Sequence, residues 1–211
     1  MQASAPAPRG RPKSASKKEQ IYVSASQLFL EKGYDGVSMD LVAENAGVSK
    51  QTVYSHFSNK EALFSACVRN KCAAHELSAE ALDPALPVGD VLKNMVGQFS
   101  SLMHSDEAIR LKRLLITHAE TNPRLSAIFY DVGPAMMKSS LEAYLQGQVA
   151  QGTLAIDDVP TAARQLLYMI QGEHLMRATL NVPGGPTKED NQAYLDACVG
   201  MFLRCYRSEG S

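Results

Sequence analysis

The 211-residue sequence has no tryptophan, few aromatic residues and no long apolar run. No segment approaches the roughly eighteen consecutive apolar residues that a membrane-spanning helix requires. The beginning of the sequence is polar and contains prolines, unlike the basic and then apolar pattern of a secretory signal peptide. We therefore expect a cytoplasmic protein that does not associate with membranes.

Metal-binding and redox motifs are also missing. The four cysteines form no C-x-x-C pair, and the five histidines lack ligand spacing with carboxylates or cysteines, so we expect no metal and no cofactor. In a reducing compartment, the cysteines are expected to act as small buried hydrophobic residues. The alternative is a redox-sensing thiol, because Cys198 and Cys205 lie seven residues apart and can share one face of a helix.

Charge is divided unevenly along the chain. Residues 1–71 carry ten Lys and Arg against six Asp and Glu, a net charge of +4. The remaining 140 residues carry eleven against sixteen, a net charge of −5. Because a basic surface attracts nucleic acid, this division predicts a DNA-binding module joined to a domain that does not touch DNA.

Segment 36–63 has the pattern of two short helices joined by a tight turn, a helix-turn-helix. Ser38 and Asp40 are both residue types that favour the N-cap of a helix. Gly47 can adopt the left-handed conformation that ends a helix, and Ser49 can cap the helix that follows. A helix pair of this kind also occurs as a simple packing motif, in proteins that never bind nucleic acid.

The second short helix, predicted over residues 50–57, has the properties of a recognition helix. Val53 and Phe57 are four residues apart and are predicted to face inward. The remaining surface is polar, slightly basic and aromatic, as a helix in a major groove requires. That surface consists of Lys50, Gln51, Thr52, Tyr54, Ser55 and His56.

These residues, read as AGVSKQTVYSHFSNKEALF, closely resemble the DNA-binding domain of TetR-family transcriptional regulators, and the resemblance extends over about residues 17–71. It implies an all-α fold in which a three-helix DNA-binding domain with a helix-turn-helix precedes a helical domain for regulation and dimerisation. We divide the chain into a flexible basic arm (1–16), the DNA-binding domain (17–71) and a ligand-binding and dimerisation domain (72–211). The residues predicted to contact DNA are Arg9, Arg11, Ser38, Ser49, Lys50, Gln51, Thr52, Tyr54, His56 and Lys60.

Base contacts are expected from Lys50, Gln51 and Thr52. Phosphate contacts are expected from Ser38, Tyr54, His56 and Lys60. The family often has glycine or another small residue where this chain has Gln51, whose amide can pair bidentately with adenine. In the arm, Arg9-Gly10-Arg11-Pro12 resembles the core of an AT-hook, which enters the minor groove of A·T-rich DNA. The alternative is a disordered tail that attracts phosphates without preference.

Apolar spacing predicts further helices beyond the helix-turn-helix. Pro134 falls inside one of them and predicts a kink. The predicted helices outside the helix-turn-helix cover about residues 17–32, 60–82, 88–103, 106–120, 123–151, 159–180 and 187–207.

The last two predicted helices carry apolar residues on two sides. This indicates that each helix is covered by other protein on both of these sides. In helix 187–207, the side with Tyr194, Cys198, Met201 and Cys205 lies opposite the side with Leu195, Val199, Phe202 and Tyr206. A homodimer through a four-helix bundle accounts for both sides, and the resemblance agrees, because TetR-like regulators usually pair through their last two long helices. A central helix buried inside a monomer is the alternative.

A small-molecule effector of unknown identity is implied by the resemblance. Apolar residues at helical spacing form a core more often than a pocket, so the assignment of individual residues stays open. The candidates are Phe99, Met103, His118, Phe129, Tyr130, Met137, Met169 and Glu173.

The function predicted from the sequence is a ligand-responsive, dimeric DNA-binding regulator that acts as a repressor on a near-palindromic operator. The chain has no nucleophile triad and no glycine-rich phosphate loop, so we do not expect an enzyme. Two alternatives are an enzyme with an accessory DNA-binding head and a helical adaptor whose partner is a protein.

Overall fold

The computed structural model describes residues 13–75 and 82–208. Within these ranges every regular element is an α-helix, and extended backbone pairs only at one isolated bridge between Leu154 and Arg207. The predicted all-α fold is therefore confirmed. The chain divides into two compact units, one up to Cys67 and one from Val68 onward.

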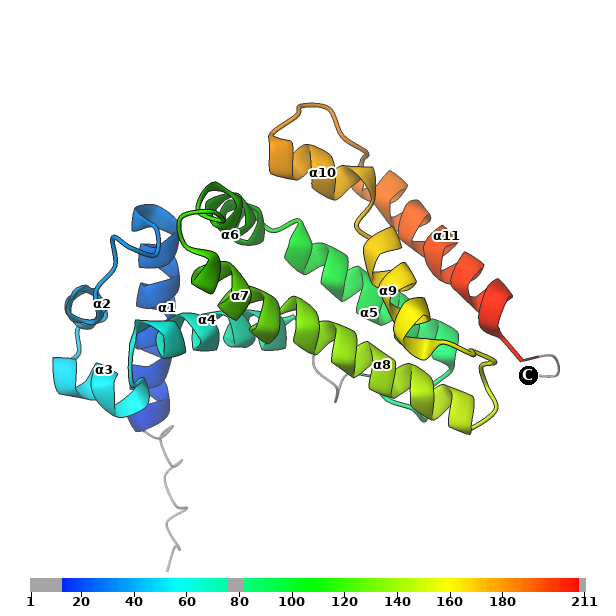
Figure 1. Cartoon of the computed structure of the whole chain (residues 1–211), viewed down its shortest axis with the longest axis horizontal. Coiled ribbons are helices and arrows are strands. Elements are labelled where there is room, and N and C mark those ends of the chain that lie inside the picture. Colours follow the sequence, from blue (N-terminus) through cyan, green and yellow to red (C-terminus); the bar gives the residue numbers. More distant parts are fainter. Residues whose placement is uncertain (1–12, 76–81, 209–211) are drawn as a thin grey trace, which may run out of the picture. The chain divides into compact units, whose positions relative to one another are not determined.

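The first unit contains three complete helices and the start of a fourth (Figure 1). The apolar positions predicted to face inward are buried, namely Ile21, Ala25, Leu28, Phe29, Val53 and Phe57. The first helix begins earlier than the predicted residue 17. The helices are α1 (Lys13–Lys32), α2 (Met39–Asn45), α3 (Lys50–His56) and α4 (Lys60–Ala74).

Aromatic packing joins α1 to α4 in this unit. The ring centroids of Phe29, Tyr34 and Phe64 lie 5.4–5.6 Å from one another, one pair stacked and two edge-to-face. Such pairs stabilise a core beyond the apolar area that they bury. The chain between α1 and α2, which carries Tyr34, is thereby held against both helices.

A buried polar contact holds α2 against α1. Ser24 of α1 is 4% exposed, and its hydroxyl donates to the carbonyl of Val42 at 3.3 Å. The same oxygen accepts a hydrogen bond from the side-chain amide of Asn45 at 3.0 Å. Because a buried hydroxyl is costly unless it is paired, these bonds favour one placement of α2 on α1.

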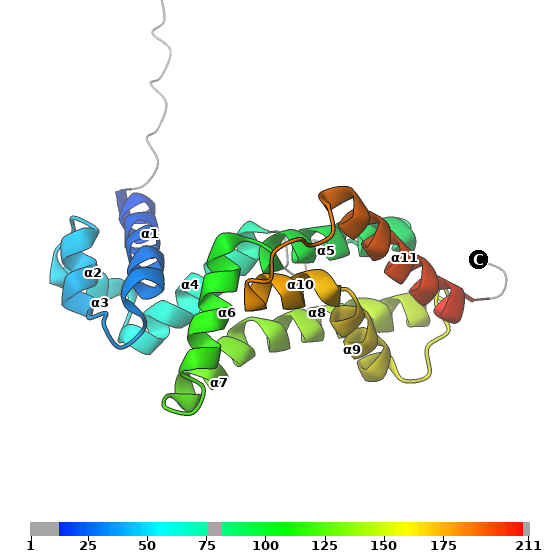
Figure 2. The same ribbon diagram turned by 90° about the horizontal axis from the view of Figure 1, so that it is seen from above.

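The second unit is built from helices that pack side by side. Helix α11 packs against α5 and α9, and α8 packs against α7 and α9 (Figure 1). Helix α10 contacts α6 (Figure 2). These helices are α5 (Val88–Met103), α6 (Asp106–Thr117), α7 (Pro123–Val132), α8 (Pro134–Ala150), α9 (Val159–Met169), α10 (Gly172–Leu180) and α11 (Lys188–Tyr206).

The apolar core of this unit draws its side chains mainly from α5, α8, α9 and α11. Its fully buried members come from four different helices, so the core ties together segments that are far apart in the sequence. They include Leu92, Leu141, Leu145, Leu166 and Val199.

The predicted helix over 123–151 is two helices. Helix α7 ends at Val132, Gly133 has the non-helical dihedral angles φ −115° and ψ −88°, and Pro134 is the first residue of α8. A proline lacks the N–H that would bond to Tyr130, and its ring clashes with that carbonyl. The result is a complete break at Gly133 instead of the predicted kink.

The predicted helix over 159–180 is also interrupted. Helix α9 ends at Met169, and α10 begins at Gly172, whose φ of +56° is left-handed. Glycine adopts this conformation without steric cost. A Cβ atom at Gly172 would lie 3.0 Å from the ring of Tyr194, so the position also needs a residue without a side chain.

The cysteines differ in burial, and only part of their predicted role is confirmed. Cys67 and Cys198 are buried, whereas Cys72 is half-buried and Cys205 is exposed. Burial raises the pKa of the Cys67 thiol to about 11. Cys198 and Cys205 lie seven residues apart on α11, so they share a face of this helix, on which Cys198 is buried and Cys205 is exposed.

Among residues 13–75 and 82–208, no helix combines the length and apolar character needed to cross a bilayer. The same residues contain no cluster of three or more His, Cys, Asp or Glu side chains arranged to hold a metal ion. One pair of histidines does meet, because the rings of His104 and His174 have centroids 4.1 Å apart.

The break between α9 and α10 gives a test of the fold. Gly172→Ala should lower the free energy of unfolding by about 1–3 kcal/mol, because it forces a left-handed alanine against Tyr194. Gly147→Ala is the matched control: it lies inside α8 with open space around it and should be neutral or stabilising by up to about 1 kcal/mol. Urea unfolding followed by circular dichroism measures both, and equal effects would contradict the assigned conformation at Gly172.

Candidate nucleic-acid interface

One glycine and two backbone hydrogen bonds form the turn between α2 and α3. Gly47 has φ +63°, and its N–H donates to the carbonyl of Glu44 at 3.1 Å. The N–H of Val48 then donates to the carbonyl of Ala43 at 3.0 Å. These bonds satisfy carbonyls at the end of α2, so the chain can reverse within a few residues.

Two serines begin the helices of the helix-turn-helix. The hydroxyl of Ser38 accepts a hydrogen bond from the N–H of Leu41 at 3.1 Å, and Ser49 accepts one from the N–H of Thr52 at 3.1 Å. The hydroxyls of Ser49 and Thr52 also share a hydrogen bond of 2.8 Å. Both predicted caps are confirmed, and Ser38 rather than Asp40 is the N-cap of α2.

Helix α3 has one buried side and one polar side, as predicted. Val53 is fully buried, and Phe57, its C-cap, is 5% exposed and lies against Tyr22 of α1 with ring centroids 5.6 Å apart. Tyr54 is 52% exposed. On the polar side, Lys50, Gln51, Tyr54 and Ser55 are exposed, and Thr52 and His56 are half-buried.

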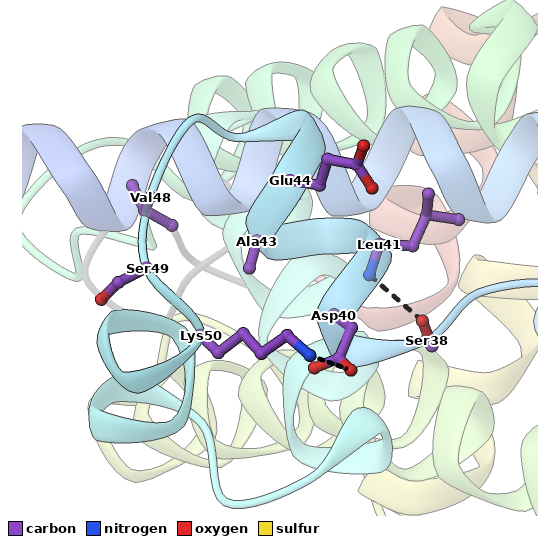
Figure 3. Close-up of a pocket in the computed structure, with 8 residues that line it drawn as sticks. All are labelled: Ser38, Asp40, Leu41, Ala43, Glu44, Val48, Ser49 and Lys50. Carbon is purple, nitrogen blue, oxygen red and sulfur yellow. Dashed lines mark hydrogen bonds and ion pairs between the residues drawn. The ribbon is translucent and has the colours of Figure 1, made fainter.

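An ion pair that sequence reasoning missed lies on this polar side. The Nζ atom of Lys50 lies 2.6 Å from a carboxylate oxygen of Asp40, in the first turn of α2 (Figure 3). The carboxylate raises the pKa of Lys50 by hydrogen bonding and by its charge. In the sequence, the pair is visible only as an aspartate ten residues before a lysine. The aspartate is interpreted there as a residue that favours a helix N-cap.

Lys60 is held by the protein itself. Its Nζ donates to the carbonyl of Tyr34 at 2.9 Å and lies 4.3 Å from the centroid of the Tyr34 ring, a cation–π contact. A phosphate contact by Lys60 would therefore share or replace these interactions. Arg9 and Arg11, which are also predicted to contact DNA, lie outside the described residues.

The match to known families covers both units. Residues 21–67 match the family of bacterial regulatory proteins of the tetR type, and residues 90–208 match the C-terminal domain of AefR-like transcriptional repressors. The chain belongs to the TetR family. This confirms the predicted class, a DNA-binding transcriptional regulator whose helix-turn-helix precedes a helical regulatory domain.

Individual relatives agree with this assignment. A TetR-family regulator from Mesorhizobium loti has 29% sequence identity and a TM-score of 0.73, covering 93% of this chain and all of that one. The flavonoid-responsive regulator FrrA has 27% identity and a TM-score of 0.72, covering 92% of this chain and 98% of that one. The uncharacterized regulator YdeS of Bacillus subtilis is 47% identical over 55 residues, which is 26% of this chain and 28% of YdeS.

The candidate effector residues of this TetR-family chain fall in different environments. Met137 is buried in the core of the second unit, and Phe99 and Met169 pack against that core. Tyr130 is 50% exposed, and Glu173 is exposed and paired with Arg177. Met103, His118 and Phe129 are half-buried. The structure thus brings Phe99, Met137 and Met169 to one core but places Tyr130 and Glu173 at the surface.

Sequence reasoning missed several buried polar groups in the regulatory domain. Tyr144 and Gln148 lie one turn apart on α8, and the Tyr144 hydroxyl and the Gln148 amide nitrogen have no hydrogen-bond partner among the described residues. Burial, together with the charge of Asp83, raises the pKa of Tyr144 to about 12, so its hydroxyl stays protonated and can donate. Buried donors without partners are candidates for contact with a ligand.

The two adjacent histidines, His104 and His174, also carry buried polar atoms. The Nδ1 atom of His104 lies 2.8 Å from the carbonyl of Ser100 and must donate to it, which leaves Nε2 as the unprotonated nitrogen of the neutral ring. That Nε2 atom and Nδ1 of His174 are buried without partners among the described residues. Burial is the main cause that lowers the pKa of His104, and the nearby His174 and Lys112 lower it further.

Proposed function

We propose that the protein is a dimeric repressor that binds a near-palindromic DNA operator and releases it when a small molecule binds. One observation carries this proposal: the polar side of α3 is exposed, while Val53 and Phe57 fix the opposite side in a core. A helix held in this way can enter a major groove without changing its own packing. The match to a family of transcriptional repressors supports repression over activation.

In the proposed complex, Lys50, Gln51 and Thr52 approach base edges. Ser38, Ser49, Tyr54, His56 and Lys60 approach phosphates, while Arg9 and Arg11 of the basic arm enter the minor groove or contact phosphates. Contacts to phosphates fix the register on the duplex, and contacts to base edges supply the sequence preference. The protein would act in the cytoplasm, and the proposal assigns it no catalytic reaction.

The proposed dimer forms through the last helices of the regulatory domain. Large apolar side chains are exposed on α9, α10 and α11, although solvent exposure of several such residues in one region is unfavourable. A second copy would cover them by packing its own α9, α10 and α11 against these helices. These side chains are Tyr168 (66% exposed), Met176 (64%), Leu180 (65%), Tyr194 (43%) and Met201 (45%).

The proposed effector is a largely apolar molecule bound among the helices of the regulatory domain. The apolar candidates Phe99, Met137 and Met169 would contact its body, and the unpartnered donors of Tyr144 and Gln148 would contact an acceptor on it. The likeness to a flavonoid-responsive regulator supports a small-molecule effector. Helix α4, which continues from the first unit into the second, would carry the signal to the DNA-binding domain.

Gln51 provides the test of base recognition. Gln51→Ala should relax the preference at one base pair of each half-site by about 1–3 kcal/mol, because one bidentate amide contact is lost. The measurement is a gel shift or anisotropy titration with the DNA upstream of the gene and with single-base variants of it. The control is Gln27→Ala on α1, which makes the same chemical change at a glutamine whose side-chain amide donates to Glu31. This variant should leave the base preference unchanged at every position.

An unchanged preference at every position in Gln51→Ala would exclude the base-reading role of Gln51. A wild-type protein that showed no salt-sensitive, sequence-selective complex would contradict DNA binding itself and would favour a protein-binding adaptor.

The dimer surface is tested by two methionines of similar exposure. Met201→Glu should raise the dimer dissociation constant at least about 100-fold, because a buried unpaired carboxylate costs several kcal/mol. Met136→Glu on α8, where the methionine is 51% exposed, should leave the dimer intact. Sedimentation velocity measures the dissociation constant, and a monomer produced only by Met136→Glu would place the interface elsewhere.

A further inference from the structure

The polar side of the helix-turn-helix contains an acidic residue where a DNA-binding surface is expected to be basic. Asp40 lies in the first turn of α2, its side chain is 53% exposed, and its carboxylate holds the ammonium group of Lys50, which is 67% exposed. The two residues come from the two helices of the motif. Both line a hollow, together with Ser38, Leu41, Ala43, Glu44, Val48 and Ser49 (Figure 3).

We propose that Asp40 sets the DNA affinity of the protein by withholding Lys50 from the duplex. This inference rests on the proposed DNA binding and adds a residue that opposes it. Figure 3 shows the lysine side chain extended from the start of α3 toward α2, so its charge is directed at the protein's own carboxylate. Lys50 must leave Asp40 before it can neutralise a phosphate or donate to a base.

The Asp40–Lys50 ion pair is weak enough for DNA to break and strong enough to lower the DNA affinity. Ion pairs between exposed side chains contribute little to stability because water and salt screen them, so DNA can break this one. Breaking it nevertheless takes part of the free energy that Lys50 gains at the duplex. The released carboxylate of Asp40 then lies near the phosphates, where its negative charge is repelled. Both effects lower the affinity for any duplex, whatever its sequence.

The carboxylate of Asp40 neither caps α2 nor belongs to its buried side. Ser38, not Asp40, caps α2, and the buried residues of α2 are Met39, Val42 and Ala43. Asp40→Asn keeps the shape of the side chain and removes its charge. A change in DNA affinity in this variant therefore reports on electrostatics at the interface and not on unfolding.

Asp40→Asn should bind a scrambled duplex about 3- to 10-fold more tightly than the wild type. The gain should shrink as the salt concentration rises, because salt screens both the attraction between Lys50 and Asp40 and the repulsion between Asp40 and the phosphates. Anisotropy titrations with a labelled duplex over a series of KCl concentrations measure both quantities. Thermal unfolding by circular dichroism checks that the variant is folded.

Two further variants test whether the effect of Asp40→Asn comes from its ion pair with Lys50. In the background of Lys50→Ala, adding Asp40→Asn should change the affinity less than it does in the wild type, because the lysine that it would release is gone. Glu44→Gln removes an equal charge one turn further along α2, from a carboxylate that Figure 3 shows turned away from Lys50. This control should change the affinity less than 2-fold and leave the salt slope unchanged.

The outcomes separate this inference from the proposed function. Weaker or unchanged binding by Asp40→Asn, in a wild type that binds DNA, would overturn the role of Asp40 and leave DNA binding intact. An effect as large in Glu44→Gln, or one undiminished in the Lys50→Ala background, would also overturn it. A wild type that does not bind any duplex, under conditions where it is folded, would overturn the proposed function itself.

Discussion

The burial of Val53 and Phe57 is the constraint on which the proposed DNA-binding surface depends. Helix α3 has seven residues, too few for an isolated helix to be stable in water, so it persists because its apolar side is packed. The contact of Phe57 with Tyr22 and the hydrogen bonds of Ser24 hold the helix-turn-helix against α1. The exposed residues of α3 thus owe their positions to the packing of its opposite side.

The regulatory domain combines a well-packed core with interruptions. Breaks at Gly133 and Gly172 interrupt what would otherwise be two long helices. The core also holds polar groups of Tyr144 and Gln148 that have no hydrogen-bond partner among the described residues. Unpaired polar groups weaken a core, so such groups are usually retained for a purpose other than stability. In the proposed function, that purpose is contact with the effector.

Much of the fold was predictable because local chemistry determines it. The serine caps, the left-handed Gly47 and the inward pair on α3 depend on residues close in sequence, and the structure confirms them. The break at Gly172 was missed because one glycine inside an apolar pattern does not reveal its φ. The Asp40–Lys50 pair and the exposure of Cys205 depend on tertiary packing, which spacing along the sequence does not report.

The central claim is that two α3 helices of a symmetric dimer read DNA sequence, and selection from a pool of random duplexes tests it most directly. The account predicts enrichment of a two-fold symmetric sequence whose half-sites have centres about 10 base pairs, or a multiple of that, apart. Recovery of duplexes with no sequence enriched over the starting pool, by a folded protein, would contradict it.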